Sequence, residues 1–208
     1  MTVDVHIRLI VSRGDKITPY QNPNANVGPI NFVIIPEYKK TDQKIYENGI
    51  TIGRVSTIRP AEYILSTHYN TLSKLNCILA SIEANKLKYD EGIMNDPHGN
   101  ISTCNSTNLF FIKKSQVWTS TGEFCLNGIT RSKAIKICNM NEIPCKETNF
   151  TFEDIKDCEE AFVTGTFAGI IPVSKIEKNV LSSTNSNSLV NKIRALYNQY
   201  INQNIVSQ

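Results

Sequence analysis

The sequence predicts an α+β domain. Short runs rich in β-branched and aromatic residues alternate with segments whose apolar residues recur at helical spacing. Two turns rich in Gly and Thr, at residues 126–130 and 164–166, each follow such a strand-like run. The 208 residues suffice to bury a full core, so we expect one domain or slightly more.

The first half of the chain opens with strands separated by loops rich in Gly, Pro and Asn. These strands are predicted at residues 5–11, 31–35 and 50–55. A helix over residues 75–85 follows, because Leu75, Ile78, Leu79 and Ile82 recur at the spacing of one helical face.

The second half alternates strands and helices up to a polar loop. The predicted elements are a hairpin over 92–101, strands 109–112, 116–118, 143–148 and 160–163, helices opening near 128 and 151, a loop over 182–188 and a final amphipathic helix. We place the domain over residues 1–180, with residues 181–208 as the loop and C-terminal helix of the same domain.

Composition excludes several classes of function. The net charge is +3, without a long basic block or interleaved aromatic residues, so nucleic acid is not an expected partner. No apolar run approaches the ~20 residues that span a bilayer, and the N-terminus lacks the pattern of a signal peptide.

The six cysteines form no CxxC pair and lie in apolar runs, which indicates buried free thiols in a reducing, cytoplasmic compartment. Cys138 and Cys145 could alternatively form a redox pair. The three histidines, His6, His68 and His98, are scattered, so no metal site is expected.

The two turns have the chemistry of an anion site. The segment LNGIT (126–130) leads from a strand into a helix, and free backbone N–H groups at a helix N-terminus attract phosphate. Gly permits close approach and Thr adds a hydroxyl. The segment TGT (164–166) could supply the other wall of this site, although most such turns are only turns.

Several segments, correctly ordered and spaced, resemble the class IV pyridoxal-phosphate (PLP) aminotransferases, which include branched-chain and D-amino-acid aminotransferases and aminodeoxychorismate lyase. They are EAN (83–85), DEGIMNDPHGNIS (90–102), NLFFIK (108–113), CLNGITRSKAIKIC (125–138) and DCEEAFVTGTFAGIIPVSKIE (157–177). The resemblance implies the large domain of a fold-type IV PLP enzyme, a pseudo-barrel like that of D-amino-acid aminotransferase, without the small N-terminal domain.

The resemblance also implies site residues. PLP phosphate would be held at Gly128, Ile129, Thr130 and Thr166, and Leu126 would lie against the pyridine ring. The backbone of Phe167 and Ala168 would help to receive the substrate carboxylate.

PLP chemistry requires a lysine amine, and Lys74 in SKLN (73–76) is the candidate catalytic residue. An ungapped count back from Glu83 instead puts Asn70 at the family's lysine position, and Asn cannot form an imine. A one-turn deletion at the helix start would bring Lys74 into place. The alternative is an ordinary solvated lysine at a helix N-terminus.

Thr103 is a second departure, because the family commonly has Glu there, paired with the pyridine nitrogen. A threonine hydroxyl can only hydrogen-bond that nitrogen, which weakens transamination and leaves elimination or racemisation conceivable. Thr103 would also suit a plain strand position.

The resemblance implies transfer of an amino group from a branched-chain or D-amino acid to a 2-oxo acid, in a homodimer. The alternatives are a lyase of the aminodeoxychorismate type and a catalytically inactive PLP-fold protein, which the missing small domain and Thr103 favour.

Overall fold

The computed structural model describes residues 5–204. They divide into two compact units, the first ending at Thr41 and the second beginning at Asp42. The first unit contains a two-stranded antiparallel sheet of β1 (Val5–Ser12) and β2 (Asn31–Tyr38), with a 3₁₀ turn η1 (Pro23–Ala25) between them. Val5 pairs with Tyr38 and Ser12 with Asn31. All eight positions of β2 are exposed, so this hairpin presents apolar side chains without a core of its own.

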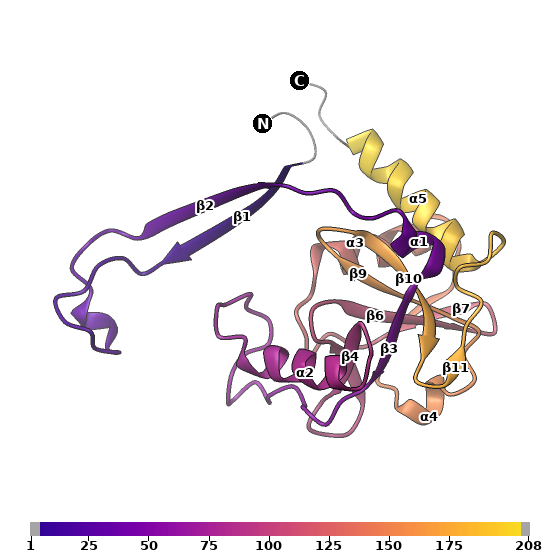
Figure 1. Cartoon of the computed structure of the whole chain (residues 1–208), viewed down its shortest axis with the longest axis horizontal. Helices are drawn as coiled ribbons and strands as arrows, with labels where there is room; N and C mark the ends of the chain where they lie inside the picture. Colours follow the sequence, from indigo (N-terminus) through magenta and orange to yellow (C-terminus); the bar gives the residue numbers. More distant parts are fainter. Residues whose placement is uncertain (1–4, 205–208) are drawn as a thin grey trace. The chain divides into compact units, whose positions relative to one another are not determined.

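The second unit is a nine-stranded sheet with helices packed on it (Figure 1). Its strands are β3 (Ile50–Arg54), β4 (Glu91–Asn95), β5 (Ile101–Cys104), β6 (Asn108–Lys113), β7 (Gln116–Thr119), β8 (Cys145–Glu147), β9 (Glu160–Gly165), β10 (Gly169–Ile176) and β11 (Asn179–Val180). Their order is β5-β4-β3-β10-β9-β6-β7-β8, with β11 beside β10. Strand β3 runs parallel to β4 and β10, and β7 parallel to β8.

Both faces of this sheet are buried. Along β6, Leu109 and Phe111 join one apolar cluster, whereas Phe110 and Ile112 join another, as the alternation of side chains along a strand requires. The second cluster includes residues of α3 (Ile129–Met140) and α5 (Leu189–Asn204). The first includes Ile155 of the short helix α4 (Phe152–Ile155).

Helix α2 (Leu75–Lys86) packs on the sheet through its smallest residues. Ala80 and Ala84 are fully buried with Val55 and Met94, whereas the four apolar residues that predicted the helix remain exposed. Those four are Leu75, Ile78, Leu79 and Ile82, with exposed fractions of 67%, 53%, 48% and 45%. The spacing thus predicts the helix correctly, but its apolar face is left without a partner within the described chain.

The α+β, fold-type IV prediction is confirmed by the structure and its relatives described below. Four elements were not predicted: the 3₁₀ turn η1, the short helix α1 (Lys44–Asn48), strand β10 and strand β11. All six cysteines are free, as predicted; four are buried, but Cys77 and Cys145 are half-buried. No helix among residues 5–204 is long and apolar enough to cross a membrane.

Candidate functional site

The N-terminus of α3 is built to receive an anion. Gly128 is the N-cap residue, with extended backbone (φ −62°, ψ 145°), and no side chain caps the helix. The first turn contains no acidic residue. The first N–H groups of a helix have no partners within it, so those of α3 present partial positive charge. Ile129 is 75% exposed, whereas Thr130 is buried.

Asn108 fixes the loop that leads into α3. Its Nδ2 donates a hydrogen bond to the Leu126 carbonyl at 2.9 Å, and the Gly128 N–H donates to the same carbonyl at 2.9 Å. A Cβ atom at position 128 would lie 2.7 Å from Asn108 Oδ1, closer than ordinary contact allows. This contact explains why the loop carries Gly at position 128.

The second predicted turn lies beside this loop in the sheet. Strands β6 and β9 pair Asn108 with Thr164. Thr164 is 2% exposed, and its hydroxyl oxygen has no hydrogen-bond partner in the described structure. Thr166 follows in the exposed turn between β9 and β10. Asn108 therefore connects Thr164 of the TGT segment to the Leu126 carbonyl in the loop before α3.

An unpredicted residue holds the turn that contains Phe167 and Ala168. The Tyr46 hydroxyl, from α1, donates a hydrogen bond to the Ala168 carbonyl at 2.8 Å. Gly169 then adopts a left-handed backbone (φ 68°), which ends the turn. A carboxylate bound at this turn would have to meet backbone N–H groups, because carbonyl oxygens only accept hydrogen bonds.

Thr103 is buried on β5, and its hydroxyl donates to the Thr107 carbonyl at 2.7 Å. The Thr103 hydroxyl proton is therefore engaged in this hydrogen bond, and only the lone pairs of its oxygen are left to face a ligand. The same loop is tied to a half-buried carboxylate, since Ser106 and Thr107 hydroxyls donate to Glu91 at 2.6 and 2.7 Å. Burial raises the pKa of Glu91 against the lowering effect of these hydrogen bonds.

Lys74 is the N-cap residue of α2. Its Nζ donates a hydrogen bond to Asn70 Oδ1 at 2.6 Å, so the two alternative Schiff-base positions contact each other. Lys74 is half-buried and lines a cavity of about 40 Å³ together with Arg59, Thr67 and Tyr69. The sequence did not single out Arg59.

Arg59 connects the start of α2 to the loop before α3. The buried guanidinium donates to Cys77 Sγ at 3.0 Å and, through Nε, to the Phe124 carbonyl at 3.0 Å. Ser102, next to Thr103, donates to the same carbonyl at 3.0 Å. The Phe124 carbonyl oxygen therefore joins three parts of the chain, because it accepts from Arg59, which contacts α2, and from Ser102 of β5.

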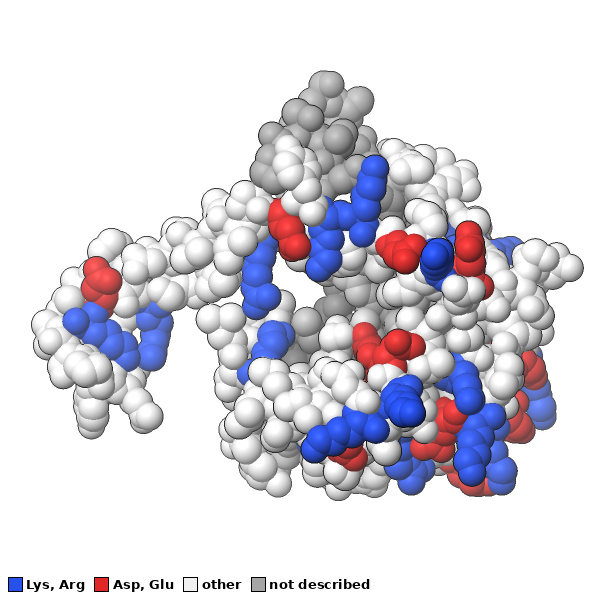
Figure 2. Space-filling view, in the orientation of Figure 1, with Lys and Arg blue, Asp and Glu red and all other residues white. Residues whose placement is uncertain are grey.

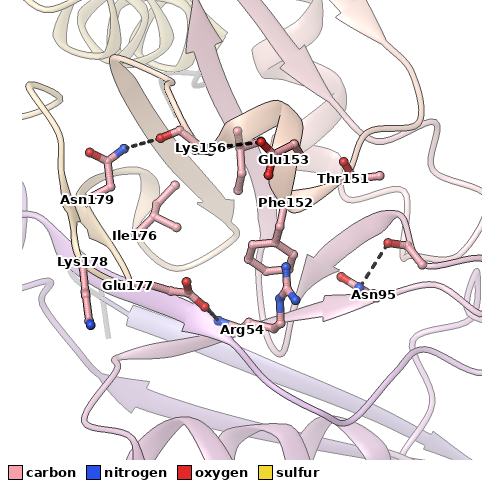
Figure 3. Close-up of a pocket in the computed structure, with 12 residues that line it drawn as sticks. Arg54, Asn95, Thr151, Phe152, Glu153, Lys156, Ile176, Glu177, Lys178 and Asn179 are labelled. Carbon is pink, nitrogen blue, oxygen red and sulfur yellow. Dashed lines mark hydrogen bonds and ion pairs between the residues drawn. The ribbon is translucent and has the colours of Figure 1, made fainter.

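A larger cavity, about 580 Å³, lies elsewhere in the second unit (Figure 3). Arg54 stacks over the Phe152 ring there, 3.8 Å from its centroid. None of the predicted site residues lines this cavity.

On the visible face of residues 42–208, Figure 2 shows acidic and basic side chains intermingled, which does not suit a polyanion. No cluster of metal-binding side chains occurs within the described residues.

Comparison with known proteins identifies the family. The model of the class IV aminotransferases matches residues 2–176. The chain is 31% identical over 198 residues to branched-chain-amino-acid aminotransferase-like protein 2 of Arabidopsis thaliana, which covers 93% of this chain and 34% of that protein. It is 29% identical over 182 residues to a D-alanine aminotransferase of Listeria monocytogenes, covering 83% of this chain and 58% of that protein.

Solved structures agree on the fold. A branched-chain aminotransferase from Thermoproteus uzoniensis, solved with norvaline, superposes with a TM-score of 0.83 at 25% identity, over 95% of this chain and 64% of that one. An aminotransferase from Brucella abortus bound to PLP gives a TM-score of 0.82 at 23% identity, over 94% and 68% of the two chains.

The chain thus spans about a third of the length of the Arabidopsis protein. The family match covers most of the chain and includes both predicted turns and the start of α2. The chain belongs to the class IV aminotransferase family.

Proposed function

We propose that this chain binds PLP and moves an amino group between an amino acid and a 2-oxo acid. The observation that carries the proposal is the uncapped N-terminus of α3 beside the buried, unpartnered hydroxyl of Thr164. An anion at this position would meet backbone N–H groups at a positive helix end and would give the orphan hydroxyl a partner.

These groups fit the phosphate of PLP. Gly128 lets the anion approach the backbone, Ile129 and Thr130 offer first-turn N–H groups, and Thr166 lies two residues beyond Thr164. Leu126 is 36% exposed and would lie against the ring. The Thr103 hydroxyl would have to turn from the Thr107 carbonyl to donate a hydrogen bond to the ring nitrogen.

When bound, PLP supplies an electron sink for the bonds at the substrate's Cα atom. The amine of Lys74 would hold the cofactor and carry a proton to and from that carbon. The backbone of Phe167 and Ala168 would orient the substrate carboxylate. The relatives' names suggest branched-chain or D-amino acids as substrates.

A second candidate is a PLP-binding protein without transaminase activity. It is favoured by Asn70, because an ungapped alignment puts this amide near the family's lysine position. Asn70 also accepts a hydrogen bond from the Lys74 amine. A lyase of the aminodeoxychorismate type would use the same residues, and one such protein, from Legionella pneumophila, shares the fold at 20% identity.

The exposed apolar face of α2 supports self-association, and we propose a homodimer in the cytoplasm.

Half-reaction spectroscopy separates these candidates. The PLP-loaded chain is mixed with L-leucine, with D-alanine or with aminodeoxychorismate, and the conversion of the cofactor to its amino form is followed by absorbance. Transamination predicts conversion with one amino acid and reversal by the matching 2-oxo acid. Binding without conversion would support the inactive candidate, and formation of pyruvate without conversion would support the lyase.

A further inference from the structure

Two thiols on different elements contact each other at the far end of α3. Cys138 lies near the C-terminus of α3, and Cys145 opens β8 seven residues later. The Cys138 thiol donates a hydrogen bond to the Cys145 sulfur, and both side chains belong to the apolar cluster beneath α3.

The backbone between the two residues is held by hydrogen bonds. The N–H groups of Asn141 and Ile143 donate to the Cys138 carbonyl at 3.1 and 2.9 Å. Val117 of β7 is the strand partner of Cys145. The short connection between the two cysteines is fixed by backbone hydrogen bonds, so both side chains stay in one apolar cluster, as a disulfide between them would require.

The two thiols differ in the way that a reactive pair requires. Cys138 is fully buried, whereas Cys145 is half-buried and can be reached from solvent. The hydrogen bond from Cys138 lowers the pKa of Cys145 against the raising effects of burial and of the Glu147 charge, and the Arg131 charge adds a smaller lowering effect. The same hydrogen bond and burial raise the pKa of Cys138. Cys145 is thus the thiol that an oxidant in solution reaches first, because Cys138 is buried.

We propose that Cys138 and Cys145 form a reversible disulfide, a modification site separate from the proposed cofactor site. With hydrogen peroxide as oxidant, the Cys145 thiolate attacks one oxygen and the O–O bond breaks. Cys145 becomes a sulfenic acid, and the other oxygen is released as hydroxide. The Cys138 sulfur then attacks the Cys145 sulfur; its proton leaves with the displaced hydroxyl as water. Two thiols are oxidised and one peroxide is reduced. A thiol reductant reverses the reaction.

The other cysteines lack this arrangement. Cys104, Cys125 and Cys158 are buried, and burial raises the pKa of each. Cys77 is half-buried like Cys145, but its sulfur accepts from the Arg59 guanidinium. Cys77 is therefore the matched control, because a non-selective oxidant would reach it as readily as Cys145.

Peptide mapping after oxidation tests the proposal. The full chain is treated with hydrogen peroxide, blocked with an alkylating reagent and digested without reductant. The expected product is a peptide that joins Cys138 to Cys145, lighter by two hydrogen atoms and restored by dithiothreitol. The variant Cys77→Ser should form it at the wild-type rate, and Cys145→Ser should not form it.

The variant Cys138→Ala should stop at the first step, leaving Cys145 as a sulfenic acid that dimedone traps. If Cys138 and Cys145 both remain alkylated while Cys77 is oxidised, or if the wild-type chain shows no joined peptide, the proposal is overturned. The wild-type map alone decides this, even if a variant fails to fold.

Discussion

Lys74 Nζ and Asn70 Oδ1 lie 2.6 Å apart, so a lysine amine and the amide one turn before it form a hydrogen-bonded pair at the start of α2. An ungapped count puts the family's Schiff-base lysine near Asn70, and a one-turn deletion would put Lys74 there, so the choice between them stays a prediction. Because the two side chains contact each other, moving the amine from position 74 to position 70 by substitution is a direct test of the proposed role of Lys74.

The variant Asn70→Lys introduces an amine at the ungapped position. If Lys74 is the amine that reacts with the cofactor, Lys74→Ala should lower the transamination rate by at least about a hundredfold, as loss of a proton-transfer group does. The double variant with Asn70→Lys should then stay inactive. Recovery of activity in the double variant, measured by the half-reaction, would show that position 70 is the competent one.

Gly128→Ala should weaken cofactor binding and the fold together. The added methyl group would meet Asn108 Oδ1 at 2.7 Å, and overpacking of this kind costs about 1–3 kcal/mol. Urea unfolding measures the loss, and absorbance titration measures PLP affinity. Gly165→Ala is the control for stability, because its methyl group would meet only Thr107 Cγ2 at 3.5 Å. Equal stability of the two variants would contradict the described contact.

Glu83 should make the chain sensitive to acid. Its carboxylate accepts hydrogen bonds from the N–H and hydroxyl groups of Ser56 at 2.7 and 2.9 Å. Burial raises the pKa of Glu83, but the bonds from Ser56 and Thr57 outweigh it and hold the pKa below its ordinary value of 4.5.

A depressed carboxyl pKa gives stability that is present above pH 4.5 and lost as the pH falls toward the folded-state pKa. Glu83→Gln should therefore lower the melting temperature at pH 7 and flatten its decline below pH 4.5. A decline as steep as that of the wild type would contradict this role for Glu83.

The exposed face of α2 should drive self-association. Ile78→Glu places a charge in the middle of a stripe that leaves four large apolar side chains open to solvent. Sedimentation velocity should show a larger species for the wild type and a monomer for the variant. Asn139→Glu, on an exposed position of α3 away from this stripe, is the matched control. A wild-type monomer at all concentrations would rule out the proposed homodimer.

The sequence predicted the elements whose signals are local. The turn LNGIT and the helix after it were located because Gly at the N-cap and the apolar spacing of α3 lie within a few residues of each other. Strand β10 was not predicted, because Gly169 and Pro172 interrupt it and proline is unusual within a sheet.

The contacts that complete the site join distant parts of the chain. Tyr46 reaches Ala168 across 122 residues, and Arg59 reaches Phe124 across 65. No local pattern marks such pairs. For α2, the sequence identified the helix but not the buried side, because Ala80 packs against β4, where Gly92 leaves room: a Cβ there would lie 3.2 Å from the Ala80 carbonyl.

Mapping of the reduced cofactor adduct tests the central proposal most directly. PLP is added to the purified chain, the imine is fixed with borohydride, and the labelled peptide is sequenced. The account predicts an absorbance band for bound cofactor and a single label on Lys74. Absence of the band, or a label scattered over exposed lysines, would contradict it and leave a member of the family without its cofactor chemistry.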